Sequence, residues 1–357
     1  MRSFARNLVA VSAVAIALGV GSARACDVCG IYSAVQFENP QKNSIRFGLV
    51  EQFTDLRTVQ RDGHYVENTD NQFLKNSFTQ VVGSYDTSDS TSLQLVLPVI
   101  GRDYRRIQEG APQDGSLFGI GDMSLIANYV PVHYSDGEAV VRWRLFTGVE
   151  LPTGDAHLLG EEAAPGHHEP EAPQHEDDSH DEGEDSHDSH DDHMSHKHGG
   201  VDHENGAENA IHGHDLALGS GSWDVPFGTG LTLQYGKYLS QTDVQYTIRT
   251  PGAYDYKYAN DWVWATALGR FLYLTDDSQV SFRARLSGQY KGFDTGKGGV
   301  RYEDTAANTT FLGPELTALL NHTWLGVLGW DIPLNTNNSD LQMAPSWRLR
   351  AALTYRF

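Results

Sequence analysis

The sequence predicts an all-β fold, a transmembrane antiparallel β-barrel of about 12 strands with long external loops. Three observations support this prediction. Several segments alternate apolar and polar residues with a period of two, which indicates strands with two unlike faces. The candidate strands are about ten residues long, enough to cross a bilayer when they are tilted. Tight turns also alternate with long loops along the chain, as they do in outer-membrane barrels.

The clearest alternation lies in residues 139–151, 279–291 and 346–357. In the last of these, every odd position is apolar or aromatic, and the even positions include three arginines. The other two segments also set apolar residues against basic ones. Because side chains alternate between the two faces of a strand, the basic residues share a face, which we expect to line the lumen. The candidate channel-lining residues are Arg142, Arg144, Glu150, Arg283, Arg285, Arg348 and Arg350.

The other expected strands show weaker alternation. They lie near 44–54, 76–86, 91–100, 121–132, 229–239, 241–250, 260–273, 310–320 and 324–334. Tight turns are expected at 86–89, 135–137, 239–241, 275–278 and 321–322, and long loops near 56–75, 101–120, 152–228, 251–259, 292–309 and 335–345. Aromatic residues near strand ends, such as Trp143 and Trp330, fit the belts found at membrane interfaces. A soluble β-sandwich is the alternative, but its apolar inner face gives no reason for successive arginines.

The N-terminus has the features of an export signal. Arg2 and Arg6 precede the apolar run 8–20, which is followed by an Ala-Arg-Ala site. These features predict a signal peptide over residues 1–25, and a lipoprotein that starts at Cys26 is the alternative. We therefore expect a periplasmic N-terminal segment at 26–43 and a barrel at 44–357, in the outer membrane of a bacterium.

The two cysteines of the chain, Cys26 and Cys29, form a Cys-x-x-Cys pair in that N-terminal segment. Glycine follows the second cysteine where haem attachment requires histidine, and a thioredoxin-like role would need a βαβ context. A disulfide is one open interpretation, because the periplasm is oxidising. A soft Cu or Zn site, shared with a periplasmic metal-handling partner, is the other.

The net charge of −21 is concentrated in one segment. Residues 155–215 hold 19 Asp and Glu but only one basic residue, Lys197, so they carry 1 − 19 = −18, and the rest of the chain carries −3. Without a basic surface, binding to nucleic acid is not expected. The segment has few large apolar residues, so we expect it to be a disordered external loop.

The same segment holds 13 of the 16 histidines. Imidazole binds Zn, Cu, Ni and Co ions, and neighbouring carboxylates can complete such a site, so metal capture is the main hypothesis. Acid sensing by protonation and an inert polar loop are the alternatives that remain open. No other cofactor is expected. The candidate metal ligands are Cys26 and Cys29 together with His167, His168, His175, His180, His187, His190, His193, His196, His198, His203, His212 and His214.

Three short motifs carry a family resemblance. They are residues 119–125 (GIGDMSL), 148–155 (GVELPTGD) and 218–224 (LGSGSWD), and 62 residues, 156–217, separate the PTGD and LGSGSWD motifs. The terminal Phe357 is similar to the last residue of bacterial outer-membrane barrels. Together these features resemble the outer-membrane transporter family named for the meta-pathway (MetA-pathway) of phenol degradation. The resemblance implies an outer-membrane channel.

The sequence therefore predicts a porin-like outer-membrane channel whose external loop captures transition-metal ions for uptake or efflux. Its expected partners are membrane lipid, metal ions or small solutes. The alternatives are a channel for small aromatic or hydrophobic organic solutes with an incidental loop, and a passive metal-sequestering surface protein. A basic lumen would favour anions, unless carboxylates such as Glu315 and Asp331 pair with the arginines in a salt-bridged wall.

Catalysis is not expected. An outer-membrane phospholipase would need a Ser-His pair, and only His64, His133 and His322 lie outside the His-rich segment. No G-x-S-x-G motif is present in the sequence, which such a nucleophile often requires.

Overall fold

The structure is a computed structural model, and it describes residues 40–163 and 208–357. The expected signal peptide (1–25), Cys26 and Cys29, and most of the expected periplasmic segment lie outside the described residues. Ten of the candidate metal ligands also lie outside them: His167, His168, His175, His180, His187, His190, His193, His196, His198 and His203.

The described chain forms an all-β, closed antiparallel barrel, as the sequence predicts. Of 14 strands in one sheet, β2 (His64–Val66) and β5 (Ala111–Ile120) lie outside the ring, which leaves 14 − 2 = 12 barrel strands. The barrel strands are β1 (Ile45–Arg61), β3 (Phe73–Asp86), β4 (Thr91–Gln108), β6 (Met123–Ser135), β7 (Ala139–Leu151), β8 (Val225–Tyr235), β9 (Tyr238–Ile248), β10 (Asp261–Leu274), β11 (Gln279–Lys291), β12 (Ala307–Leu320), β13 (Trp324–Asn338) and β14 (Leu341–Arg356).

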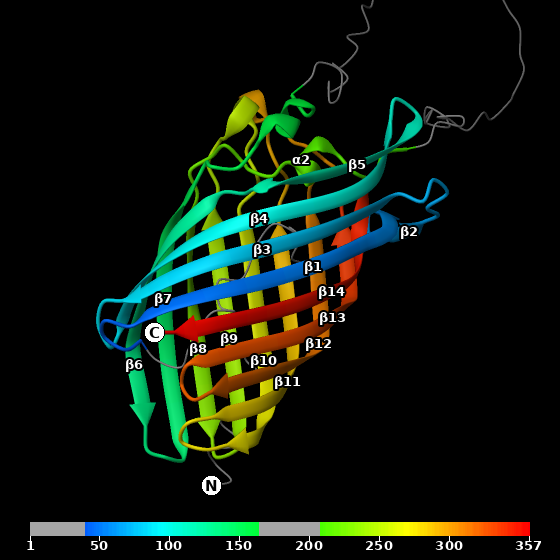
Figure 1. Ribbon diagram of the computed structural model, residues 1–357. Helices are drawn as coiled ribbons and strands as arrows, with labels where there is room; N and C mark the ends of the chain where they lie inside the picture. Colours follow the sequence, from blue (N-terminus) through cyan, green and yellow to red (C-terminus); the bar gives the residue numbers. More distant parts are fainter. Residues whose placement is uncertain (1–39, 164–207) are drawn as a thin grey trace, which may run out of the picture.

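The sheet closes where its first and last strands meet. β1 pairs with β14 in antiparallel register from Arg46 opposite Arg356 to Arg61 opposite Leu341. The Phe357 N–H donates to the Ile45 carbonyl oxygen at 2.8 Å. Figure 1 shows β1 and β14 side by side at this seam, with every other barrel strand beside its neighbour in the chain. Closure leaves no free sheet edge in the ring, which a barrel within a bilayer requires.

The β4–β5 hairpin corrects one expectation. Residues 101–120, expected as a long loop, instead continue β4 to Gln108 and return as β5. A two-residue turn joins them, with Glu109 at φ 52° and Gly110 at φ 76°, as a twisted hairpin favours. The hairpin rises beyond the rim of the barrel in Figure 1. Most of β5 is at least partly exposed on both faces, so it carries no apolar alternation that could mark it as a strand.

Three other connections also differ from the expected ones. The turn expected at 239–241 lies between Tyr235 and Tyr238, and the loop expected at 335–345 shrinks to the turn between Asn338 and Leu341. β1 likewise runs to Arg61 through part of the expected loop 56–75. Strands that extend beyond the membrane carry polar residues on both faces, so their sequence resembles that of a loop.

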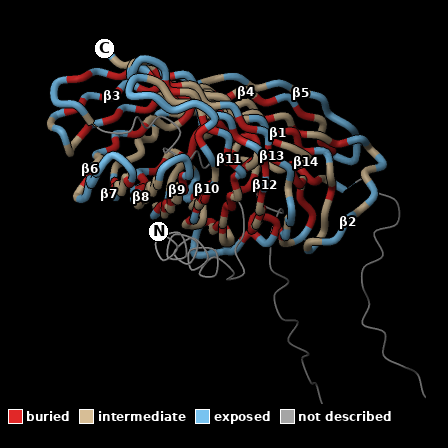
Figure 2. Tube along the Cα trace, turned by 90° about the horizontal axis from the view of Figure 1, so that it is seen from below, coloured by how far each residue is buried: buried red, intermediate tan, exposed pale blue. Residues whose placement is uncertain are grey.

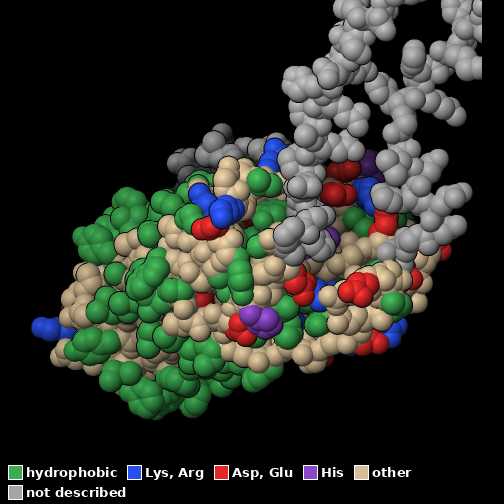
Figure 3. Space-filling view, turned by 90° about the horizontal axis from the view of Figure 1, so that it is seen from above, with side chains coloured by type: hydrophobic (Ala, Val, Ile, Leu, Met, Phe, Trp, Pro, Cys, Tyr) green, Lys and Arg blue, Asp and Glu red, His purple; other side chains and the backbone are tan. Residues whose placement is uncertain are grey.

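The two faces of the barrel wall match the predicted alternation. On β14, Leu349 and Leu353 are exposed, whereas Arg348 and Thr354 are buried inside the barrel. Figure 2 shows buried and exposed positions alternating along the strands. In Figure 3, hydrophobic side chains cover a broad area of the outer surface, and charged side chains gather towards one end. An apolar exterior around a polar lumen suits a barrel surrounded by lipid.

Both described ends of the acidic segment are folded, which differs from the disorder expected over 155–215. Residues His157–Gly160 form a 3-10 helix, η2, and Gly213–Leu216 form a short helix, α2. Leu159, Ile211 and Leu216 are fully buried, and the last two pack against Leu56, a residue of the barrel wall. The leucine and isoleucine side chains of the segment, Leu158, Leu159 and Ile211, lie at its ends, so these ends bury enough surface to order. None of the described helices is long and apolar enough to cross a membrane.

The outer face provides a test of the membrane assignment. Leu328 on β13 is 53% exposed on that face. Leu328→Arg should destabilise the folded barrel in lipid by about 2 kcal/mol, because hydrocarbon does not solvate a guanidinium. The measurement is the urea midpoint of unfolding in lipid vesicles. Asn335→Arg, at the exposed loop end of the same strand, is the control and should change the midpoint little. Equal midpoints for the two variants would contradict a lipid-facing Leu328.

Candidate functional site

The three sequence motifs meet at the loop end of the barrel. Asp122 accepts hydrogen bonds from the Gly154 N–H at 2.8 Å and from the Ser220 N–H and hydroxyl at 2.7 Å each. A Cβ atom added to Gly219 would lie 2.5 Å from the carbonyl carbon of Gly154, so the two backbones can approach only because both residues are glycine. The motifs thus hold together the two ends of the acidic segment, which the sequence separates by 62 residues, 156–217.

Arg249 lies at the centre of the charges beneath this motif cluster. Its Nη1 donates to Glu150 Oε1 and Asp224 Oδ2 at 2.8 Å each, and its Nε donates to Asp261 Oδ2 at 2.9 Å. Asp224, the last residue of the LGSGSWD motif, is fully buried. The predicted lining residue Glu150 therefore faces the lumen as expected, but within an ion-pair network.

A second network holds most of the predicted arginines. Asp331 accepts hydrogen bonds from Arg348 at 2.9 Å and from Arg350 at 2.8 Å. Glu315 accepts one from Arg350 at 2.6 Å, forms an ion pair with Arg283 and lies 3.6 Å from Arg285. This arrangement is the salt-bridged wall, which is one of the two interpretations of the basic lumen that the sequence allows.

Arg144 pairs separately, because its Nη2 donates to Asp243 Oδ1 at 3.0 Å. No local pattern in the sequence marks Asp243 or Asp224 as a partner of these arginines. Which carboxylate meets which arginine depends on the register of the strands, and alternation along one strand does not give that register. All seven predicted lining residues face the lumen, and most of them are paired there.

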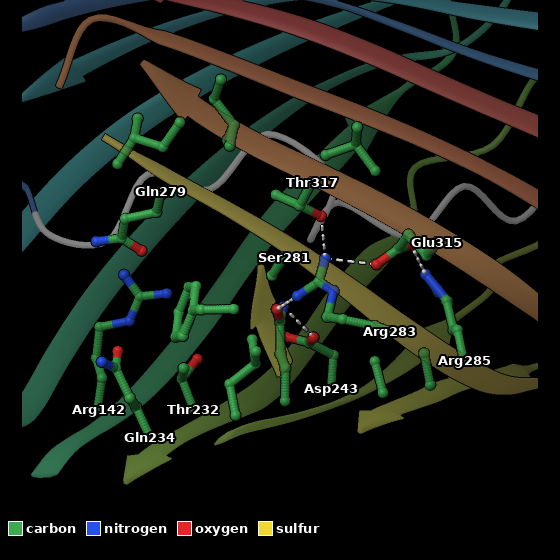
Figure 4. A pocket seen from close by; sticks show the side chains of 18 of the residues that line it. Arg142, Thr232, Gln234, Asp243, Gln279, Ser281, Arg283, Arg285, Glu315 and Thr317 are labelled. Atoms are coloured by element: carbon green, nitrogen blue, oxygen red, sulfur yellow. Dashed lines mark hydrogen bonds and ion pairs between the residues drawn. The ribbon is translucent and has the colours of Figure 1, made fainter. Parts of the chain in front are cut away.

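Two cavities lie inside the barrel, one near each end. The loop-end cavity measures about 50 Å³ and is lined by residues of the motif cluster together with apolar side chains such as Phe78, Ile100 and Leu218. The turn-end cavity measures about 140 Å³. Its wall combines apolar side chains such as Phe271 and Leu319 with polar ones. Figure 4 shows the polar residues of the turn-end cavity: Arg142, Thr232, Gln234, Asp243, Gln279, Ser281, Arg283, Arg285, Glu315 and Thr317.

The turn-end cavity has an excess of positive charge. Its lining includes four arginines (Arg142, Arg283, Arg285 and Arg350) and two carboxylates, Asp243 and Glu315. The formal balance of the lining is thus 4 − 2 = +2. Asp243 and Glu315 accept hydrogen bonds from arginines, and Asp331, which lies outside the lining, pairs with Arg350, so the charges are partly compensated. What remains is a cavity with apolar patches and a modest preference for anions.

His212 and His214 come together with a carboxylate from another loop. His212 Nδ1 lies 3.2 Å from Asp304 Oδ2, and His214 Nδ1 lies 3.0 Å from Glu162 Oε1. The two imidazole rings stack with their centroids 5.6 Å apart. The sequence predicts the two histidines as metal ligands but not Asp304 or Glu162, because no local pattern marks a contact between separate loops.

The buried pair of His214 and Glu162 has strongly shifted ionisation. Burial lowers the pKa of His214, but the carboxylates of Asp215 and Glu162 outweigh this effect and raise that pKa to about 10. Burial raises the pKa of Glu162, but His214 and then His212 outweigh it and bring that pKa well below its usual range. In the absence of other ligands, the two side chains therefore form a charged, hydrogen-bonded pair.

Comparison with known proteins shows a likeness in fold. An outer membrane channel from Pseudomonas putida F1 has a TM-score of 0.58 and 13% sequence identity, over 92% of this chain and 100% of that one. The β domain of the Bordetella autotransporter BrkA has a TM-score of 0.40 and 11% identity, over 87% of this chain and 99% of that one. The monoaromatic hydrocarbon channel CymD has a TM-score of 0.38 and 7% identity, over 94% and 97%.

The search against protein-family models found no match, and the search of curated proteins found none either. The likeness to the channel from Pseudomonas putida F1 therefore concerns the fold. Together with the closed barrel and its apolar exterior, it places the chain in the bacterial outer membrane.

The charge network in the lumen gives a stability prediction. Asp331 is fully buried and receives hydrogen bonds from Arg348 and Arg350, so Asp331→Ala leaves two guanidinium groups without this partner. We expect a loss of about 3 kcal/mol or more in the free energy of unfolding. Refolding into detergent micelles at increasing urea concentration measures it. Asp277→Ala, in an exposed turn, is the matched control, and a similar loss in both variants would refute the role of the network.

Proposed function

We propose that the protein is an outer-membrane channel for small organic solutes, with a preference for anionic ones such as aromatic carboxylates. The observation that carries this proposal is the turn-end cavity, in which apolar side chains stand beside an excess of two positive charges, 4 arginines against 2 carboxylates. Apolar patches favour an organic group, and the excess charge favours a carboxylate.

The composition of the lumen supports organic solutes over bare metal cations. Arginines outnumber carboxylates in the turn-end cavity, and a positive lumen raises the electrostatic barrier for a cation. The resemblance of the three motifs to the outer-membrane transporter family of the phenol meta-pathway points the same way. So does the fold shared with a bacterial outer membrane channel.

Metal capture for uptake or efflux remains the second candidate. It rests on the histidines of the acidic segment, of which the structure describes His157, His212 and His214. Capture at an external loop does not require the metal to pass through the lumen. The two functions can therefore be tested separately.

Planar-bilayer recording tests the channel and its selectivity. We expect conductance steps and a reversal potential that favours chloride over potassium in a KCl gradient, and benzoate should also carry current. Arg142→Gln removes one charge of the turn-end cavity and should lower the ratio of chloride to potassium permeability by about twofold, since one screened unit charge changes ion energies by less than about 1 kcal/mol.

Arg270→Gln is the matched control for this experiment. Arg270 lies on β10 opposite Phe282, at a position that faces outward. This variant should keep the selectivity of the unmodified protein. The absence of conductance above that of an empty bilayer would overturn the channel. A preference for potassium would overturn the anionic cargo.

A further inference from the structure

Two separate segments bring three metal-type ligands together at the loop end of the barrel. His212 and His214 lie at the start of α2, and Asp304 lies in the connection between β11 and β12. One ligand atom from each of these residues lies within 4.8 Å of the other two. Ligands of a tetrahedral zinc ion lie about 3.4 Å apart, from bond lengths of about 2.1 Å. Shifts of about 1.4 Å or less would therefore bring the three atoms around one ion.

Two of these ligand atoms lack hydrogen-bond partners among the described residues. Asp304 is 4% exposed, and no donor bonds its Oδ1. His212 Nδ1 is also without a hydrogen bond, although it lies 3.2 Å from Asp304 Oδ2. A buried carboxylate oxygen without a partner is costly. Asp304 Oδ1 and His212 Nδ1 are thus two unbonded polar atoms on neighbouring side chains, which a cation bound by both residues would explain.

The third ligand is held in place by its neighbours. Glu162 Oε1 lies 3.0 Å from both the backbone nitrogen and the Nδ1 atom of His214. A carboxylate that binds one ring nitrogen of a histidine orients the other nitrogen towards a metal ion. The Tyr258 hydroxyl donates to the His214 carbonyl oxygen at 3.1 Å, and the Tyr256 ring stacks on the imidazole. The ring is therefore fixed before any ion binds.

We propose that His212, His214 and Asp304 form a binding site for a divalent transition-metal ion of the Zn²⁺ type. Two imidazoles and a carboxylate are a ligand set that such ions prefer. Glu162 and Asp215 lie against His214 at 3.0 and 3.4 Å, and together with Asp304 they supply negative charge that offsets the charge of the ion. An ion here ties the end of the acidic segment that carries His212 and His214 to the connection between β11 and β12, and Glu162 at its other end contacts His214. The proposal does not depend on the cargo of the channel.

The test must separate this site from the ten histidines in residues 164–207. It starts from the full-length protein in detergent with those ten residues changed to glutamine and with Cys26 and Cys29, the other candidate metal ligands, changed to serine. Equilibrium dialysis followed by metal analysis counts the bound Zn²⁺, and visible absorption of Co²⁺ reports the coordination. We expect one Zn²⁺ per chain and the intense bands of four-coordinate Co²⁺. A starting variant that binds no Zn²⁺ would overturn the site.

Asp304→Asn in this background should weaken Zn²⁺ binding by about tenfold or more. Asp304→His restores a ligand and should retain tight binding, which a merely structural role for Asp304 would not explain. Glu303→Gln is the matched control, because Glu303 is the exposed neighbour and pairs with Arg301. Equal affinities for Asp304→Asn and Glu303→Gln would refute the proposal. Heat-modifiable migration in gels checks the folding of each variant, and His212→Gln, at a partly exposed position, replaces any variant that fails.

Discussion

A strand inside a bilayer has no water to bond its backbone, and this constraint governs the structure. Every barrel strand must pair on both sides, so the sheet has to close through β1 and β14. Closure then creates two kinds of surface. The outer one contacts lipid and carries leucine, valine and aromatic side chains, whereas the inner one is shielded from lipid and can hold charge.

Charge inside the barrel is stable because carboxylates from several segments converge on the arginines. Arg249 contacts Glu150 of β7, Asp224 of the LGSGSWD motif and Asp261 of β10. Such networks line the two cavities that lie within the described part of the barrel. Because paired charges largely cancel each other, only the net charge of the lining acts on a solute in these cavities. The motif cluster thus has a structural role and also lines the loop-end cavity.

The sequence predicts a strand most accurately where one face of the strand is apolar and the other is polar. Residues 279–291 alternate strongly and form β11 (Gln279–Lys291) with the predicted bounds. The β4–β5 hairpin was missed because residues 108–116 around its turn are mostly polar and show no apolar alternation. In the candidate sites, the inward arginines and the two described metal-type histidines could be identified. Their partners Asp243 and Asp304 could not, since strand register and loop packing bring them into contact.

The pairing of β1 with β14 has a consequence for how the barrel assembles. Apart from β7 and β8, which the acidic segment separates, every other neighbouring pair in the ring lies close in the chain, so those hairpins can form through local contacts. The seam joins residues as distant as Ile45 and Phe357, and joining such distant segments is entropically costly until the intervening strands are in place. The final step of assembly is therefore the meeting of two exposed strand edges. Until then both edges are open to pairing with another chain, which makes the unclosed sheet the stage most prone to aggregation.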